Sequence, residues 1–341
     1  MRFLLPVGCV AAALALAQPV PHVPPYPRVD NAIGYKADPS WPRQKPPGGE
    51  WGQMSSVAIG PDGNIWTFNR GKLPVQVYTP DGDLVKAWGE GGLFKNPHTI
   101  RFDAAGNLWI ADTGTNTVRR FSTDGKVLLT LGTPNQAGAD ETHLNQPNDV
   151  AVAPNGEIYV SDGYGNDRVV VFDKGGKYLR SWGKLGNGPG EFSQPHSLAL
   201  DSKGRVYVAD RNNDRIQIFD SQGQFLGQWK NIITPWALFI TKEDDIYVCG
   251  SSPMLWSEVP ASQAALATPP KDQLFMRLDT EGRLKQLWVI PKGDQPGEVN
   301  WIHSMAVATD GSIYFAEVQG KRAQKFVPIG AAAGSRLNAR R

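Results

Sequence analysis

The chain has 341 residues, 40% of them hydrophobic, and a formal net charge of +2 at pH 7. This composition is typical of a globular protein with a sizeable core, and the near-neutral charge argues against nucleic acids and anionic membranes as partners. The 37 glycines, 27 prolines and 11 tryptophans favour short β-strands joined by many turns.

The N-terminal residues 1–17 predict an export signal. Arg2 supplies a positive start, residues 3–16 are almost entirely apolar, and residues 15–17 form an A-x-A cleavage site. The apolar run is too short to span a membrane. We therefore expect an exported protein, periplasmic or secreted, that is cleaved near Ala17. Its mature chain would keep Cys249 alone, so it would have no internal disulfide.

Residues 18–47 are rich in proline, and we expect them to lie extended over the surface or to add one edge strand. Residues 48–328 consist of six copies of one pattern, which is the main feature of the sequence. The copies begin at or near Ser55, Asn96, Gln146, Gln194, Pro235 and Ile302.

Each copy contains four short β-rich runs, and the turn after the first run has a glycine, replaced by Asp244 in the fifth copy. Four antiparallel strands repeated at roughly 40 to 50 residues form one blade of a β-propeller. The pattern predicts an all-β fold: a six-bladed β-propeller with four-stranded antiparallel blades around a central channel.

The ends of the propeller and one insert break the pattern. The sixth copy ends near Val327 after three strands, and we expect residues 33–41 to supply the fourth and so close the ring. Residues 251–271 are extra and lie between the second and third strands of blade five. This insert is a candidate lid over the channel or a tolerated surface loop. The tail, residues 329–341, is predicted to be disordered.

Three of the five histidines occupy one position of the repeat, at the top of the innermost strand. In blades one to six this position holds Ser56 or Ser55, His98, Asn148, His196, Trp236 and His303. Because the innermost strands line the channel, and alternate blades of a six-fold ring are related by about 120°, the three imidazoles should converge on the axis. His22 and His143 fall outside this position and are expected at the surface.

Three converging imidazoles with open coordination positions are typical of a catalytic zinc site, whereas a structural zinc site has four protein ligands. Zinc is the first expectation, although such a site also takes copper, iron or cobalt. The alternative is that the histidines line the channel and bind only water and backbone.

Polar residues follow the second run of each copy. Asp112, Asp162 and Asp210 each precede an arginine by five to seven residues, which favours a local salt bridge or turn. The pairs would join these aspartates to Arg119, Arg168 and Arg215.

Arg70, Arg211 and Tyr164 differ because they break the repeat. Two arginines on opposite blades beside a metal suit a carboxylate or oxyanion substrate, and a tyrosine beside them suits a general base. Ordinary surface positions are the alternative for each.

The sequence resembles a known family. YVADRNNDRIQIF from Tyr207 nearly matches the signature of NHL repeats. More specifically, residues 50–327 resemble the catalytic core of peptidyl-α-hydroxyglycine α-amidating lyase. The matching motifs include FNRG with Arg70, PHTIRFD with His98, VSDGYGNDRVV with Tyr164, FSQPHSLAL with His196, VADRNNDRIQ with Arg211 and IHSMAV with His303.

The resemblance implies a reaction and the residues for it. It implies that His98, His196 and His303 bind zinc, that Tyr164 and Arg70 lie at the reacting hydroxyl, and that Arg211 helps to place the substrate. The reaction would cleave the N–C bond of an α-hydroxyglycine-type amide, releasing an amide and glyoxylate. The substrate would be a small molecule or a peptide.

Three positions depart from the family. Ser304 replaces an aspartate that helps to bind a structural calcium, so a calcium site would rest on the backbone carbonyls near Val57 and Ile100. Trp301 replaces a methionine of the substrate pocket, and Gly165 replaces a disulfide-forming cysteine. These departures leave the metal centre in place and the substrate open.

Two other functions remain open on the sequence. One is a non-catalytic exported NHL propeller that binds a peptide, protein or glycan; the other is a metal-dependent lactonase-like hydrolase. Propellers host all of these functions, so the fold does not choose among them. A monomer is expected in each case.

Overall fold

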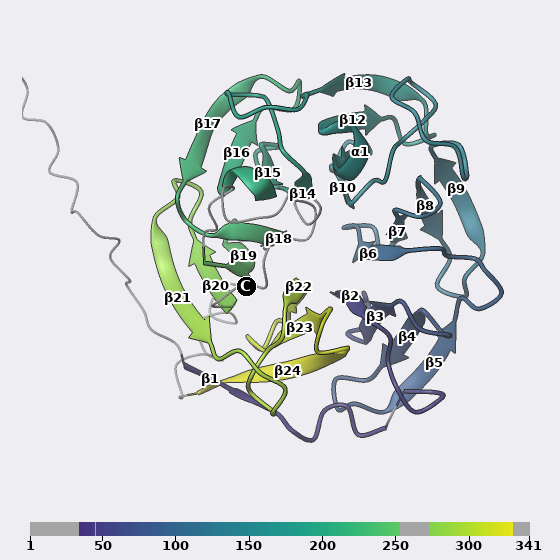
Figure 1. Ribbon diagram of the computed structural model, residues 1–341, viewed down its shortest axis with the longest axis vertical. Helices are drawn as coiled ribbons and strands as arrows, with labels where there is room; N and C mark the ends of the chain where they lie inside the picture. The colour runs from purple at the N-terminus through teal and green to yellow at the C-terminus, as the bar shows by residue number, and fades with distance from the viewer. Residues whose placement is uncertain (1–33, 45, 253–272, 330–341) are drawn as a thin grey trace, which may run out of the picture.

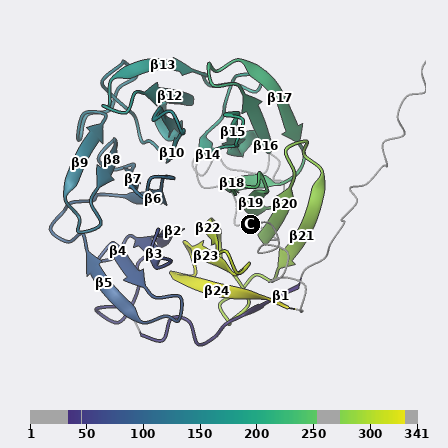
Figure 2. The same ribbon diagram turned by 180° about the vertical axis from the view of Figure 1, so that it is seen from behind.

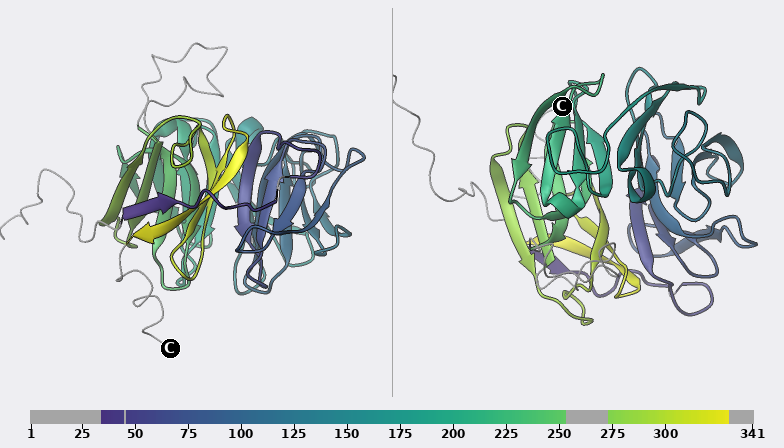
Figure 3. Two further views of the ribbon diagram at one scale, coloured as in Figure 1. Left: turned by 90° about the horizontal axis from the view of Figure 1, so that it is seen from below. Right: turned by 45° about the horizontal axis from the view of Figure 1, so that its top comes forward.

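The computed structural model describes residues 34–44, 46–252 and 273–329, which form six four-stranded antiparallel sheets arranged in a ring (Figures 1 and 2). Each sheet is one blade, with its first strand nearest the axis and its last at the rim. Seen edge-on, the blades stand side by side around the ring (Figure 3). The predicted six-bladed β-propeller is confirmed.

Apart from β1, which is the outermost strand of blade six, the strands follow one another through the blades in chain order. Blades one to three contain β2 (Met54–Ile59), β3 (Ile65–Asn69), β4 (Val75–Tyr78) and β5 (Leu84–Trp88); β6 (Pro97–Phe102), β7 (Leu108–Asp112), β8 (Thr117–Phe121) and β9 (Val127–Leu131); and β10 (Asp149–Val152), β11 (Ile158–Asp162), β12 (Arg168–Phe172) and β13 (Tyr178–Trp182). Blades four to six contain β14 (Pro195–Leu200), β15 (Val206–Asp210), β16 (Arg215–Phe219) and β17 (Phe225–Lys230); β18 (Thr234–Ile240), β19 (Ile246–Ser251), β20 (Gln273–Leu278) and β21 (Leu284–Ile290); and β22 (Ile302–Val307), β23 (Ile313–Glu317), β24 (Arg322–Ile329) and β1 (Gly34–Ala37).

Two short helical turns, α1 (Gly163–Asn166) and the 3₁₀ turn η1 (Arg211–Asn213), follow the second strands of blades three and four. None of the helices in the described part of the chain is long and apolar enough to cross a membrane.

The turn between the first two strands of each blade explains the repeated glycine. Gly63, Gly106, Gly156, Gly204 and Gly311 all have φ between +76° and +89°. L-residues pay a steric cost in this left-handed region, and aspartate pays less than most. Asp244, which replaces the glycine in blade five, has φ +63°, so the substitution keeps the same turn.

The hydrophobic core lies between neighbouring blades. The second strands are buried on both faces, as in β11, whereas the rim strand β13 alternates between half-buried and exposed residues. Trp88 at the end of β5 packs on Phe94 and Phe121 of the next blade, with ring centroids 6.0 Å and 5.7 Å away. Because each blade buries one face against the next, the inner strands are held rigidly around the axis.

The sixth blade is completed by the N-terminal side of the chain. β1 pairs antiparallel with β24, with Gly34 opposite Ile329. Trp41, which is 5% exposed, packs its ring 5.9 Å from that of Tyr78 in blade one and 5.1 Å from that of Tyr314 in blade six. The segment therefore joins the first and last blades and closes the ring.

The structure extends one predicted boundary. β24 runs to Ile329, one residue beyond the predicted end of the propeller at 328, because this residue still pairs with β1. The rest of the tail predicted at 329–341 lies outside the described residues. So do the predicted export signal at 1–17 and all but the first two residues of the insert at 251–271.

Candidate metal centre

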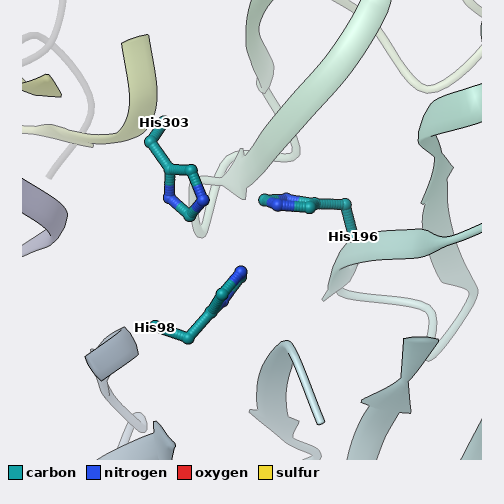
Figure 4. A group of neighbouring side chains, drawn as sticks. All are labelled: His98, His196 and His303. Atoms are coloured by element: carbon teal, nitrogen blue, oxygen red, sulfur yellow. The ribbon is translucent and has the colours of Figure 1, made fainter. Parts of the chain in front are cut away.

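Three histidines from alternate blades meet on the axis of the ring (Figure 4). His98 lies on β6, His196 on β14 and His303 on β22, and each pair of imidazole ring centroids is 4.8 Å apart. One nitrogen from each ring lies within 4.8 Å of those of the other two. All three side chains are buried. The structure thus brings together the histidines that share one position of the repeat.

A backbone carbonyl of the next blade orients each imidazole. The Nδ1 atoms of His98, His196 and His303 lie 2.7, 2.6 and 2.6 Å from the carbonyl oxygens of Asn148, Trp236 and Ser55. A carbonyl oxygen only accepts, so each Nδ1 carries the hydrogen and donates it, and each Nε2 keeps a free lone pair. The acceptors occupy the same repeat position in the intervening blades. In blade one, that position is Ser55 rather than Ser56.

The imidazoles are held neutral by their surroundings. Burial lowers the pKa of His98 and His196 well below the usual value, and the neighbouring His303 lowers both further. Burial, followed by the charge of Arg70, lowers the pKa of His303 to about 3. Neutral nitrogens with free lone pairs are the form that binds a metal ion. The three-nitrogen set therefore fits a divalent transition metal, with zinc, copper, iron and cobalt all compatible.

The repeated acidic residues hold the histidine-bearing strands in place. The carboxylate of Asp112 accepts from the backbone N–H of Asn96 at 2.9 Å, two residues before His98. Asp210 accepts from the N–H of Ser193 at 2.7 Å, three residues before His196. These carboxylates thus anchor the starts of β6 and β14, which sets the positions of His98 and His196.

The Asp–Arg pairs predicted from the repeat are present. The closest nitrogen–oxygen distances are 3.7 Å for Asp112–Arg119, 2.9 Å for Asp162–Arg168 and 2.6 Å for Asp210–Arg215. A further pair, Glu317–Arg322 at 3.0 Å, has the same place in blade six. Sequence reasoning missed it because glutamate replaces aspartate there, although the spacing of five residues to the arginine was available as a signal.

Tyr164 faces the centre. Its hydroxyl oxygen lies 3.2 Å from Nε2 of His98 and 3.0 Å from Nε2 of His196. The tyrosine is carried by α1, which is pressed against blade four. A Cβ on Gly163 would lie 2.0 Å from the carbonyl oxygen of Pro195, so only glycine fits there. Asn148 accepts from the N–H of Gly163 at 2.9 Å and fixes the start of the turn.

Arg211 lies beside Tyr164 and is buried. It begins η1, and its Nη1 donates to the hydroxyl oxygen of Tyr164 at 3.4 Å. Its guanidinium carbon lies 4.7 Å from the ring centroid of Trp236 and 5.4 Å from that of Tyr164. The two aromatic faces therefore hold this cation at the centre.

Arg70 approaches the centre from blade one. Its Nη1 donates to Oε1 of Gln53 at 2.8 Å, and its Nε donates to the carbonyl oxygen of Pro97 at 3.2 Å. Arg211 donates in the same way to Oε1 of Gln194. Both glutamines lie two residues before the shared repeat position, so the two arginines are held alike in opposite blades. Sequence reasoning missed both glutamines, although their shared offset was a signal.

An apolar wall covers one side of the centre. Trp236 lies with its ring centroid 5.3 Å from that of His196 and 5.2 Å from that of Trp301, and Val318 completes the cluster. Trp301, identified from the sequence as a change in the pocket, is buried. Trp236 shares the histidines' repeat position, but no sequence pattern marked it as part of the site.

Val57 and Ile100 lie two residues beyond the shared repeat position of blades one and two. Both are buried, and they line a cavity of about 130 Å³ in the channel. Ser304, which follows His303, lines the same cavity.

Fold and site together define a six-bladed β-propeller of the NHL-repeat class with a three-histidine centre on its axis. A family model described as a 6-bladed beta-propeller matches residues 137–249. NHL repeat-containing protein 3 of Homo sapiens is 31% identical over 324 residues, which cover 87% of this chain and 85% of that protein. The chain belongs to the family of NHL repeat-containing protein 3.

Two further relatives carry names from the amidating family. Peptidyl-glycine alpha-amidating monooxygenase of Mus musculus is 36% identical over 195 residues, which are 48% of this chain and 20% of that protein. A probable peptidyl-alpha-hydroxyglycine alpha-amidating lyase of Caenorhabditis elegans is 32% identical over 49% of this chain and 55% of its own length. The chain thus spans about a fifth of the first relative and about half of the second.

Among solved structures, a gluconolactonase from Xanthomonas campestris matches with a TM-score of 0.60 and 13% identity, over 89% of this chain and 94% of that one. At this identity, the likeness shows the shared propeller fold alone.

Proposed function

We propose that this chain is a metal-dependent lyase that cleaves the N–C bond of an α-hydroxyglycine-type amide, releasing an amide and glyoxylate. The observation that carries the proposal is the hydroxyl of Tyr164, held 3.2 Å and 3.0 Å from the Nε2 atoms of His98 and His196. This position supports Tyr164 as the general base that would take the proton from a hydroxyl bound at the three-histidine centre. The relatives named for the amidating lyase support the same reaction.

The metal would be zinc, held by His98, His196 and His303. It would act as a Lewis acid that makes the substrate hydroxyl more acidic. The three imidazoles are already neutral and oriented, so little reorganisation would be needed to bind it.

The protein's own groups account for the remaining steps. Arg70 and Arg211 would hold the substrate's carboxylate and the developing alkoxide through charge-assisted hydrogen bonds. Tyr164, as its phenolate, would accept the hydroxyl proton. The oxygen's electron pair then forms the aldehyde C=O of glyoxylate while the C–N bond breaks, and its electrons go to nitrogen. Tyr164 would return the proton to that nitrogen, so the amide leaves neutral and the tyrosine is ready for another cycle.

Trp236 and Trp301 would form the surface on which the apolar part of the substrate packs. The two ring centroids are 5.2 Å apart, and the rings form a buried apolar wall beside Arg211. An acyl group next to the scissile nitrogen would pack on this wall, which favours an apolar acyl chain or an apolar penultimate residue.

We also propose, from the export signal predicted at residues 1–17, that the reaction takes place outside the cytosol.

The test is to offer an N-acyl-α-hydroxyglycine to zinc-loaded protein and to measure glyoxylate. Glyoxylate release well above the uncatalysed rate is expected. Tyr164→Phe should lose about 10²-fold or more in kcat with zinc content unchanged. Release of glyoxylate at the wild-type rate by Tyr164→Phe would remove the tyrosine as base, and no release by metal-loaded wild type would refute the reaction.

A second candidate is a non-catalytic propeller that binds a peptide, protein or glycan. It is favoured by the match to NHL repeat-containing protein 3, whose name states no enzymatic activity and which matches over 87% of this chain, against 49% for the worm lyase. This candidate function predicts that metal-loaded protein releases no glyoxylate. It also predicts that Tyr164→Phe still binds the peptide, protein or glycan. The same assay therefore separates the two functions.

A further inference from the structure

The guanidinium of Arg101 places a positive charge among the innermost strands of the propeller, farther along β6 than His98. Arg101 lies on β6, three residues beyond His98, and its side chain is 23% exposed. Its Nε donates to Oδ1 of Asp149 at 2.6 Å and its Nη2 to Oδ2 at 2.5 Å. This is a bidentate pair, the strongest arrangement of guanidinium and carboxylate, and the Asp149 side chain is only 2% exposed.

The same guanidinium reaches two more blades. Nη2 of Arg101 also donates to Oγ of Ser197 at 3.1 Å and to the carbonyl oxygen of Leu238 at 3.0 Å. Arg101, Asp149, Ser197 and Leu238 lie on β6, β10, β14 and β18, the innermost strands of blades two to five. One side chain therefore ties four consecutive blades together across the channel.

The carboxylate of Asp149 is fully used within this network. Besides Arg101, it accepts from Oγ of Ser197 at 2.7 Å and from the N–H of Leu198 at 3.1 Å. Oγ of Ser197 in turn accepts from the N–H of Leu238 at 3.0 Å. Asp149 therefore has little capacity left to coordinate a metal ion.

The rest of the channel offers a poor donor set for calcium. The residues lining the cavity beside Arg101, which include Val57, Ile100 and Ser304, contain no aspartate or glutamate. Oγ of Ser304 lies 3.2 Å from Oγ of Ser56, which also donates to the carbonyl oxygen of Ile100 at 3.5 Å. Calcium takes six to eight oxygens and usually several carboxylates, so the calcium that the family resemblance implies does not fit these residues.

We propose that this protein needs no second metal ion in its channel, because the guanidinium of Arg101 supplies the positive charge that ties the innermost strands together. The three-histidine centre would then be its one metal requirement among the described residues. The proposal does not depend on the lyase reaction, because it concerns the inner channel and not the substrate face.

Two measurements test it on the full-length, zinc-loaded chain. The first is the thermal unfolding midpoint with and without millimolar CaCl₂, together with the calcium content after dialysis against calcium. No stoichiometric calcium and no shift in the midpoint are expected. One calcium per chain, or a midpoint raised by roughly 3 °C or more, would overturn the proposal.

The second measurement is a mutant cycle on the ion pair. Arg101→Met leaves Asp149 buried and unpaired, and we expect the midpoint to fall by roughly 5 °C or more. Arg101→Met combined with Asp149→Asn removes the stranded charge and should recover at least half of that loss. Arg283→Met is the matched control, since Arg283 pairs with Asp279 at the surface with its side chain 71% exposed, and should change the midpoint by about 1 °C or less.

A midpoint for Arg101→Met equal to that of Arg283→Met would overturn the proposed role of the guanidinium. If Arg101→Met fails to fold, the double variant and the calcium measurement on wild type still test the proposal. A double variant that is also unfolded, or calcium bound by wild type, would each contradict the proposal.

Discussion

Replacing His303 with asparagine should remove part of the acid sensitivity of the metal-free protein. Burial and the charge of Arg70 lower the pKa of His303 from 6.5 to about 3. Between these values, the unfolded chain binds a proton that the folded chain does not. The free energy of unfolding therefore rises with pH in this window, and stability is lost as the pH falls from 6.5 toward 3.

The size of the effect follows from the two pKa values. Going from pH 7 to pH 5 protonates this imidazole almost completely in the unfolded chain and hardly at all in the folded one. The linkage relation then gives a loss of about 2 kcal/mol from this residue. His98 and His196 act in the same direction, since burial lowers both of their pKa values. Asparagine keeps an N–H that can donate to the carbonyl oxygen of Ser55, but it has no proton to gain in this range.

Urea unfolding of chelator-treated protein at pH 7 and pH 5 would measure the effect. Wild type should lose about 2 kcal/mol more than His303→Asn between the two conditions. Equal losses in the two proteins would refute the reasoning, because His303 would then have the same pKa in the folded and unfolded chains. Val85→Asn on the exposed rim removes no titratable group, so it is the control and should keep the full wild-type loss.

Three further predictions follow from the geometry. His196→Ala should lower the zinc content from about one per chain to near zero in elemental analysis, whereas His143→Ala should not; equal content in both variants would exclude His196 as a ligand. Gly163→Ala would place a Cβ 2.0 Å from the carbonyl oxygen of Pro195, so α1 must shift by about 1 Å and turnover of the proposed reaction should fall roughly 10²-fold. Gly227→Ala, where a Cβ would meet nothing within 4 Å, should keep full turnover, and a fall in both would show that the loss is not specific to α1. Trp41→Ala should lower the free energy of unfolding by about 3–5 kcal/mol because the ring is buried between the first and last blades, whereas Val85→Ala on the exposed rim should cost less than 1 kcal/mol in the same urea titration.

The fold could be read from the sequence because it is repetitive. A propeller blade is a local unit of four strands, and its turn glycines and strand periodicity recur at each copy. The same regularity marked the histidines, since a residue at one position of the repeat has a symmetry-related place in every blade. The sequence alone therefore assigns His98, His196 and His303 to the axis.

Other parts of the site depended on contacts between blades. Gln53 and Gln194 orient Arg70 and Arg211 through side-chain geometry that no local pattern specifies. The carbonyl oxygens that orient the imidazoles belong to Ser55, Asn148 and Trp236, and any residue type could supply them. The sequence could not decide whether Ser55 or Ser56 occupies the shared repeat position, because two identical residues stand next to each other. Only the strand register shows that it is Ser55.

The sequence by itself determined the six blades and the three histidines that meet on the axis. Only the tertiary structure showed that Asn148 fixes the turn carrying Tyr164 and that Arg101 contacts both Asp149 and Leu238. The physical reason is that a repeat fixes where each backbone position lies around the axis. Which side chains meet across the axis depends on rotamers and on distances between residues far apart in the chain, and these are settled only when the ring closes.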